Sequence, residues 1–221
     1  MCTLLTQNIC LICHTQLLQL GGNQIGDAGL AAFAKAVESE ALPQLESLYL
    51  YGNRIGDDGI SAFADALSKG APPQLKELFL PRNSIGDIGI ASLADALSKG
   101  ALASLQKLFL GENQIGDAGL SALAEAVGKG ALPALEQLEL TLNKIGDVGL
   151  SALASACASG ALPALQILQL SGNNIGDAGL TALADACASG ALPKCTTIMT
   201  FGNPASNEAQ QAVEDAIASR Q

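Results

Sequence analysis

The sequence is poor in large and in basic side chains. Its 221 residues contain no Trp, one His, two Tyr and five Phe, so Ala and Leu must provide most of the core packing in a chain that is 49% hydrophobic. Only 11 residues are Lys or Arg, against 21 Asp and Glu, and the formal net charge is −10. Nucleic acids and anionic membranes attract an excess of basic residues. The composition therefore argues against both as partners.

Long apolar runs are also missing. No run approaches the roughly 18 residues that a membrane-spanning helix needs. The first basic residue is Lys35, and no unbroken apolar segment precedes it, so the N-terminus does not resemble a secretory signal. Six cysteines in 221 residues are too few for a disulfide scaffold. We therefore expect a cytoplasmic protein that is not inserted in a membrane.

Catalytic groups are scarce as well. The single histidine, His14, lies near the N-terminus, which excludes a Ser-His-Asp or Cys-His arrangement in the remaining chain. The Gly-containing segments lack the Lys of a phosphate-binding loop. We predict that the protein is not an enzyme and uses no cofactor or metal.

What the sequence does contain is an internal repeat of 30 residues. An asparagine recurs at this interval without a slip, at Asn23, Asn53, Asn83, Asn113, Asn143 and Asn173, and again at Asn203 in a weaker copy. The copies share the frame Leu-x-x-Leu-x-Leu-x-x-Asn and continue with Ile-Gly-Asp. A constant interval indicates that each copy is held rigidly by its neighbours.

Each copy has the pattern of one strand followed by one helix. The Leu-x-Leu pairs, such as Leu48 and Leu50, have the period of a short strand with one buried face. The Asn amide can donate and accept, so it can bond backbone groups that the next turn leaves unpaired. The Gly that follows indicates a tight turn, and the Asp, such as Asp57, a helix N-cap. The helix is predicted to end at a Gly, such as Gly100.

This frame resembles the leucine-rich repeats of the ribonuclease-inhibitor type, over roughly residues 16 to 203. The resemblance implies an α/β solenoid of about seven units. Because strands pack about 4.8 Å apart and helices about 8–10 Å apart, we expect an arc with a parallel sheet on the concave side and helices on the convex side. We predict an N-terminal entry segment or cap over residues 1–15, the repeats over 16–194, and a degenerate last repeat with a capping helix over 195–221.

The segment NICLICH, residues 8–14, contains the Cys-x-x-Cys-His pattern of covalent haem attachment. Haem would also need an apolar pocket and usually a second axial ligand. Cys2, Cys10, Cys13 and His14 could instead bind zinc, although their spacing is irregular. In the 30-residue register the segment leads into the first strand, so we interpret it as a cap, with haem and zinc as the alternatives.

Two further sets of residues have structural interpretations. The recurring Asp, at Asp27, Asp57, Asp87, Asp117, Asp147 and Asp177, is interpreted as a helix cap, because a calcium site needs several oxygens that converge on one point. Cys157 and Cys187 occupy the same helix position in neighbouring copies, about 10 Å apart and beyond disulfide reach. We predict that both thiols fill the core.

The positions that vary between copies are the candidates for function. One concave-facing strand column reads Gln19, Tyr49, Phe79, Phe109, Glu139, Gln169 and Met199. Exposed aromatics surrounded by mixed charge are typical of a protein-binding surface. We predict the partner-binding residues to be Tyr49, Tyr51, Arg54, Glu77, Phe79, Arg82, Lys107, Phe109 and Glu139. The alternative is cross-strand aromatic packing that only stiffens the sheet.

Three functions fit these expectations. The first is a non-catalytic module that binds another protein on its concave face. The second, implied by the resemblance, is a regulator of an enzyme, either an inhibitor or a GTPase activator with the same type of repeat. The third is a structural subunit, because the first strand, LLQL, offers an open edge to a larger complex or a second copy.

Overall fold

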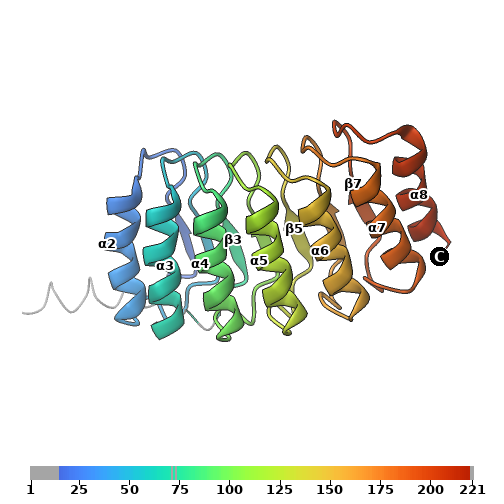
Figure 1. Cartoon of the computed structure of the whole chain (residues 1–221). Coiled ribbons are helices and arrows are strands. Elements are labelled where there is room, and N and C mark those ends of the chain that lie inside the picture. Colours follow the sequence, from blue (N-terminus) through green and yellow to red (C-terminus); the bar gives the residue numbers. More distant parts are fainter. Residues whose placement is uncertain (1–14, 71, 73, 220–221) are drawn as a thin grey trace, which may run out of the picture.

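The computed structural model describes residues 15–219 except 71 and 73, and these residues form seven strands that alternate with seven helices (Figure 1). The strands are β1 (Leu17–Gln19), β2 (Ser47–Tyr49), β3 (Glu77–Phe79), β4 (Lys107–Phe109), β5 (Gln137–Glu139), β6 (Ile167–Gln169) and β7 (Thr197–Met199). The helices are α2 (Asp27–Glu38), α3 (Asp57–Gly70), α4 (Asp87–Ser98), α5 (Asp117–Gly128), α6 (Asp147–Ala158), α7 (Asp177–Ala188) and α8 (Asn207–Ala218). We number the repeat units 1 to 7 after their strands.

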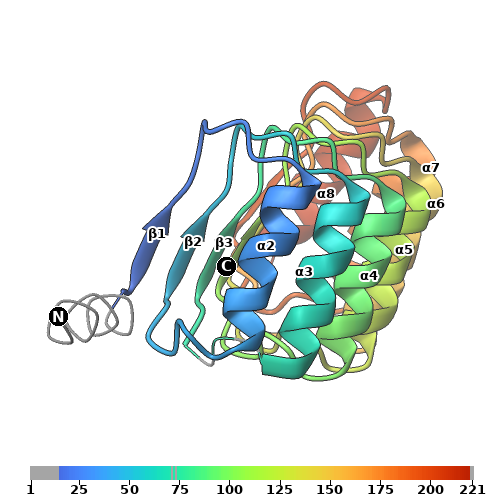
Figure 2. The same ribbon diagram turned by 90° about the vertical axis from the view of Figure 1, so that its left-hand side faces the viewer.

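The strands form one parallel sheet in sequence order, from β1 to β7. Equivalent residues of neighbouring units are paired, for example Leu48 with Leu78 and Leu78 with Leu108. The helices lie side by side on one face of the sheet, and among residues 15–219 no helix lies on the other face (Figure 2). The predicted α/β solenoid is confirmed.

The core lies between the sheet and the helices and is built from the repeated apolar positions. Leu48, Leu50, Ile55 and Ile60 of unit 2 are all fully buried. In unit 1 the equivalent Leu18, Leu20 and Ile25 are only partly buried, because no described unit covers their outer side. Burial of a Leu or Ile side chain is worth about 1.5–3 kcal/mol, so packing between units provides most of the stability.

The asparagine of each unit is bonded to the unit before it. The Asn113 Nδ2 group donates to the Leu110 carbonyl at 3.0 Å and to the Leu80 carbonyl of the previous unit at 3.1 Å. Its Oδ1 accepts from the Ile85 N–H, also of the previous unit, at 3.1 Å. The prediction that this amide bonds backbone groups of the turn is confirmed, and the bonds join neighbouring units.

The recurring aspartate does not cap its own helix, as the sequence suggested. Gly86 is the N-cap residue of α4, and no side chain bonds to that helix from its N-cap. Instead, the Asp87 Oδ1 atom accepts from the N–H groups of Gly116, at 2.7 Å, and of Gly119, at 2.9 Å. These two glycines belong to unit 4 and start α5, so each aspartate caps the helix of the next unit.

The same contact explains the two glycines of the Gly-Asp-x-Gly frame. A Cβ atom at Gly119 would lie 2.7 Å from the Asp87 Oδ1 atom, and one at Gly116 would lie 3.2 Å from Oδ2. Gly116 has φ −108, so it does not adopt the left-handed conformation that the interpretation of this glycine as a tight turn implied. Glycine is required here because the aspartate of the previous unit approaches closely.

The predicted core role of the two helix cysteines is confirmed. Cys157 and Cys187 are both fully buried. Burial raises the pKa of the Cys157 thiol to about 12, with smaller contributions from Cys187 and Cys195.

The N-terminal predictions concern residues 1–14, including Cys2, Cys10, Cys13 and His14, which lie outside the described residues. Among the residues that are described, no group of His, Cys, Asp and Glu side chains could hold a metal ion. Within the same residues, no helix has the length and apolar character required to cross a membrane.

Candidate functional site

Three aromatic side chains stack across adjacent strands on the face of the sheet that the helices leave open. Strand register pairs Tyr49 with Phe79 and Phe79 with Phe109. The ring centroids are 4.4 Å and 4.3 Å apart, and the rings are tilted by 55° and 58°. All three side chains are half-buried. We call Tyr49, Phe79 and Phe109 the aromatic ladder.

A polar row accompanies the ladder on the amino-terminal side of the strands. The Glu77 carboxylate accepts hydrogen bonds from the Ser47 hydroxyl at 3.0 Å and from the Tyr49 hydroxyl at 2.8 Å. It also forms an ion pair with the Lys107 ammonium group at 2.7 Å. Glu77 thereby fixes the Tyr49 ring and neutralises the charge of Lys107 beside the ladder.

These bonds shift the pKa values of both partners. Burial alone would raise the pKa of the Glu77 carboxyl group, but the hydrogen bonds from Lys107, Tyr49 and Ser47 together lower it below its usual value. The hydrogen bond to Glu77 raises the pKa of the Tyr49 hydroxyl, and burial adds to this effect. Glu77 is therefore ionised and Tyr49 is protonated near neutral pH.

Tyr51 lies beside the ladder but leans toward unit 1. Its side chain is 45% exposed. A Cβ atom at Gly21 would lie 2.5 Å from the Tyr51 ring, so the ring crosses the position that a side chain of unit 1 would occupy. Tyr51 thus extends the aromatic surface by one unit beyond the ladder.

Glu139 differs from the exposed, partner-binding carboxylate that the sequence suggested. It is only 9% exposed, and it accepts from the N–H groups of Gly111 and Thr141, both at 2.9 Å. A Cβ atom at Gly111 would lie 2.4 Å from the Glu139 Oε1 atom, so the carboxylate fits only because unit 4 has a glycine there. Burial raises the pKa of Glu139 more than the two N–H bonds lower it. Glu139 ends the ladder and offers a partner little surface.

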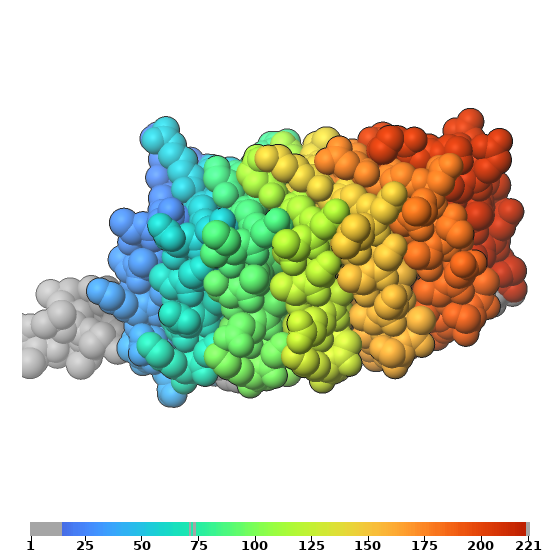
Figure 3. Space-filling model, in the orientation of Figure 1, coloured from blue at the N-terminus to red at the C-terminus, as the bar shows by residue number. Residues whose placement is uncertain are grey.

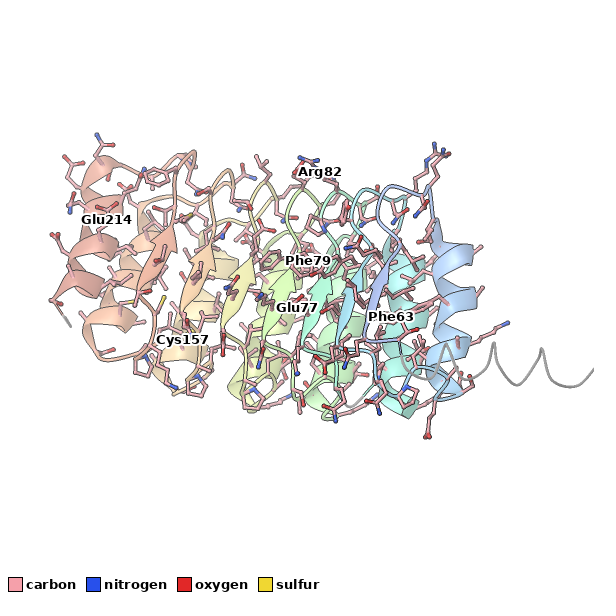
Figure 4. All side chains as sticks on the ribbon, turned by 180° about the vertical axis from the view of Figure 1, so that it is seen from behind. Phe63, Glu77, Phe79, Arg82, Cys157 and Glu214 are labelled. Carbon is pink, nitrogen blue, oxygen red and sulfur yellow. The ribbon has the colours of Figure 1, made fainter. Side chains whose placement is uncertain are left out.

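The two candidate arginines, Arg54 and Arg82, lie on the rim formed by the loops after the strands. Figure 4 labels Glu77, Phe79 and Arg82 one above another in unit 3, from the lower part of the sheet to this rim. Arg82 forms an ion pair with Glu112 at 2.8 Å. Arg54 is exposed and forms no ion pair with another described residue.

A sequence comparison identifies the family. The profile described as "Leucine Rich repeat" matches residues 16–34, 42–64, 101–124, 132–154 and 162–184, which together make up about half of the chain. The chain belongs to the leucine-rich repeat family. No curated protein matches the sequence. Leucine-rich repeats generally mediate protein–protein interactions and are typically non-catalytic.

The unit between two of the matched segments has the same architecture. Residues 77–79 form β3 and residues 87–98 form α4, in register with the strands and helices on either side. The leucine-rich repeats are therefore continuous across the segment that the profile does not match. This unit contains Phe79, the centre of the ladder.

Charge is distributed unevenly between the two sides of the leucine-rich repeats. We define the sheet side as the segments 16–24, 46–54, 76–84, 106–114, 136–144, 166–174 and 196–204. Its basic residues are Arg54, Lys76, Arg82, Lys107 and Lys144, and its acidic residues are Glu46, Glu77, Glu112, Glu136 and Glu139. Five charges of each sign cancel, so the formal net charge of −10 resides in the rest of the chain. Most of that part is the ridged helix side (Figure 3).

The sequence placed most of the candidate residues in one neighbourhood but missed how they are arranged. Tyr49, Glu77, Phe79, Lys107 and Phe109 are brought together on β2 to β4. The roles of Ser47, Gly21 and Gly111 were not predicted, because they depend on contacts between units. The available signal was that each glycine has a large side chain in the next unit: Gly21 adjoins Tyr51 at the same position of unit 2, and Gly111 adjoins Glu139 of the ladder column in unit 5.

Proposed function

We propose that the protein is a non-catalytic interaction module that binds a partner protein on its sheet face, with the aromatic ladder as the centre of contact. The observation behind this proposal is the stack of Tyr49, Phe79 and Phe109 at one position of three adjacent strands. Partly exposed aromatic side chains with polar neighbours are the residue types that dominate binding energy at protein interfaces.

The surroundings of the ladder support the same proposal. On one side, Glu77 and Lys107 neutralise each other beside the rings. On the other side lie Tyr51, which is 45% exposed, and Pro81, which is half-buried. An apolar centre with a paired, solvent-accessible polar border is the general anatomy of a protein interface.

The ladder is not needed to build the sheet. Units 1, 5, 6 and 7 have Gln19, Glu139, Gln169 and Met199 at the same position and still form paired strands. Packing between the rings adds stability, about 0.5–1.5 kcal/mol for each pair. Stiffening alone, however, gives no reason for aromatics in three consecutive units only.

The proposal is tested by affinity capture from an extract of the source cells, followed by mass spectrometry. Phe79→Ala removes the centre of the ladder, and Tyr51→Ala removes a 45% exposed ring that lies over Gly21. We expect both variants to lose the captured partner, because truncation of a central aromatic side chain costs about 2 kcal/mol or more of binding energy. Tyr51→Ala should leave the unfolding midpoint in urea unchanged.

The matched control is Met199→Ala, which truncates a 38% exposed apolar side chain at the same position in unit 7. It should retain the partner. If Phe79→Ala and Tyr51→Ala both capture the partner as well as the wild type does, the sheet face is not the binding surface.

A second candidate function, a structural subunit, is supported by the edge of the sheet. Among the described residues β1 pairs only with β2, and Leu17 on β1 is 49% exposed. An open parallel edge with an exposed Leu can pair with another chain. Light scattering of purified wild type and Leu17→Lys tests this candidate. A larger particle for the wild type that becomes a monomer in the variant would support it, and monomers in both cases would refute assembly of copies through this edge.

A further inference from the structure

One position on the rim, directly before the repeated asparagine, has a left-handed backbone in every unit. In units 1, 2, 6 and 7 it is a glycine, with φ between 63 and 73 at Gly22, Gly52, Gly172 and Gly202. In units 3, 4 and 5 it is Arg82, Glu112 or Leu142, with φ of 58, 52 and 55. Residues with a Cβ atom are strained in this backbone conformation, whereas glycine adopts it without strain.

The three non-glycine residues are not required by the fold, because four units form the same turn with glycine. Their side chains point outward: that of Arg82 is 69% exposed, and Leu142 is 57% exposed. Leu142 leans over unit 6, where a Cβ atom at Gly172 would lie 2.6 Å from its Cδ2 atom. Backbone strain that folding does not need is found preferentially at functional positions.

The strained positions adjoin the aromatic ladder. The ladder occupies units 2 to 4, and the three non-glycine residues occupy units 3 to 5. All ten charged residues of the sheet side lie between residues 46 and 144, in the same four units 2 to 5. These departures from the repeat all fall in units 2 to 5, and Arg82 and Glu112 belong to both the charged and the left-handed residues.

The rim is also the one part of the sheet side with unpaired positive charge. Arg54 and Lys144, which directly follow the repeated asparagine, are exposed and form no ion pair with another described residue. Arg82 is paired with Glu112, which is the single acidic residue in the parts of the sheet-side segments that follow the strands. We call Arg54, Arg82, Glu112, Leu142 and Lys144 the charged rim.

We propose that the charged rim is a second contact line for the partner and that it binds an acidic segment of that protein, while apolar side chains of the same segment contact the aromatic ladder. The inference rests on the proposed binding role of the sheet face. Two unpaired cations on the edge of a neutral face, in a chain of net charge −10, favour a partner with carboxylates at that edge. Leu142 adds an apolar contact beside Lys144, on the side of unit 6.

The test uses a phage-displayed library of random linear peptides as the probe, selected against immobilised wild-type protein. We expect selected peptides to combine Asp or Glu with aromatic or aliphatic residues. Their affinity for the double variant Arg54→Glu, Lys144→Glu should fall by about tenfold or more, because opposed charges then become like charges. The matched control is Lys99→Glu, Lys129→Glu, which makes the same charge change on the helix side and should leave the affinity unchanged.

Two outcomes of this selection separate the inference from the proposed function. If Phe79→Ala binds the peptides that were selected against the wild type with unchanged affinity, the sheet face itself is not the binding site. If Phe79→Ala loses them while Arg54→Glu, Lys144→Glu binds them as the wild type does, the ladder binds peptide and the charged rim does not, which overturns this inference alone.

The strained positions are tested by the triple variant Arg82→Gly, Glu112→Gly, Leu142→Gly, which restores the residue that the other four units have. We expect the unfolding midpoint in urea to equal or exceed that of the wild type. We also expect the affinity for the selected peptides to fall by about fivefold or more. An unchanged affinity would overturn the proposal. A lowered midpoint would also overturn it, because these side chains would then be retained for folding.

Discussion

Removal of one repeated aspartate tests whether the units are joined as the structure indicates. Asp87→Ala deletes the carboxylate of unit 3 that accepts from the N–H groups of Gly116 and Gly119 in unit 4. If the aspartate capped its own helix, the damage would appear at the start of α4. The structure predicts that it appears at the start of α5.

The magnitude follows from the two bonds and their environment. A hydrogen bond to a charged group contributes about 1.5–3 kcal/mol, and loss of a side-chain helix cap costs about 1 kcal/mol and up to about 2 kcal/mol. Both bonds end on the same oxygen, at 2.7 Å and 2.9 Å, and water can reach the partly buried N–H groups in the variant. We therefore expect the free energy of unfolding to fall by about 2 kcal/mol, below the sum of two independent bonds.

Urea denaturation gives the stability, and amide hydrogen exchange locates the loss. The Gly116 and Gly119 amides should lose protection, whereas amides in the first turn of α4 should keep theirs. The matched control is Asp95→Ala, because Asp95 is exposed and pairs only with Lys99 at 2.6 Å on the helix side, so its loss should cost less than about 0.5 kcal/mol. A loss as small as that of the control, or deprotection of α4 instead of α5, would refute the reasoning.

Three further predictions concern buried groups. Asn113→Ala removes four hydrogen bonds to the backbone, and urea denaturation should show a free energy of unfolding lowered by about 3–4 kcal/mol. The control Asn23→Ala, at an exposed position, should lower it by under about 1 kcal/mol. Burial raises the pKa of Glu139, so the folded state favours the protonated carboxyl group. The wild type should therefore lose stability relative to Glu139→Gln as the pH rises from about 4.5 through the folded pKa. Urea denaturation between pH 4 and 7 measures this stability difference, and a constant difference would contradict the prediction. The thiol of Cys157, with a pKa of about 12, should not react with a thiol reagent at about pH 8 until urea unfolds the protein, and prompt labelling of the folded state would be the opposite result.

The fold could be predicted because the information for it lies within each unit. The pair Leu48 and Leu50 has the period of a strand, and the apolar stripe after Asp57 has the period of a helix. Once the same pattern recurs every 30 residues, the parallel order of the strands follows from the connections. The sequence also indicated the aromatic column, because equivalent positions of adjacent parallel strands must be neighbours.

The roles that could not be predicted depend on contacts between units. The sequence places Asp87 directly before a helix, which is the signature of a cap, but the bonding distance to the next unit depends on the stagger of the helices. Glu139 has an exposed position in the column, yet it turns down over Gly111 because that residue lacks a side chain. Both cases require the geometry of two units at once, and a pattern read along one unit contains only half of it.

The distinction between frame and exception also bears on function. Asparagine, aspartate and the buried leucines satisfy the turn, the helix start and the core in each inner unit, so folding places few demands on the open face of the sheet. A position free of such demands can vary, and in units 1, 6 and 7 the ladder column contains Gln19, Gln169 and Met199, with no charge on the sheet side of these units. Units 2 to 5 differ in the aromatic column, in the charged residues and in the left-handed rim residues, and Arg82 and Glu112 belong to both of the last two sets. The first two have stabilising contacts as an alternative explanation, since the rings pack on one another and charged residues such as Glu77 and Lys107 form ion pairs. The third acts against stability, because glycine fits that backbone better than Arg82, Glu112 or Leu142. The left-handed rim residues cost stability and lie beside the aromatic ladder, which the fold does not need. A bound partner explains this combination better than packing does.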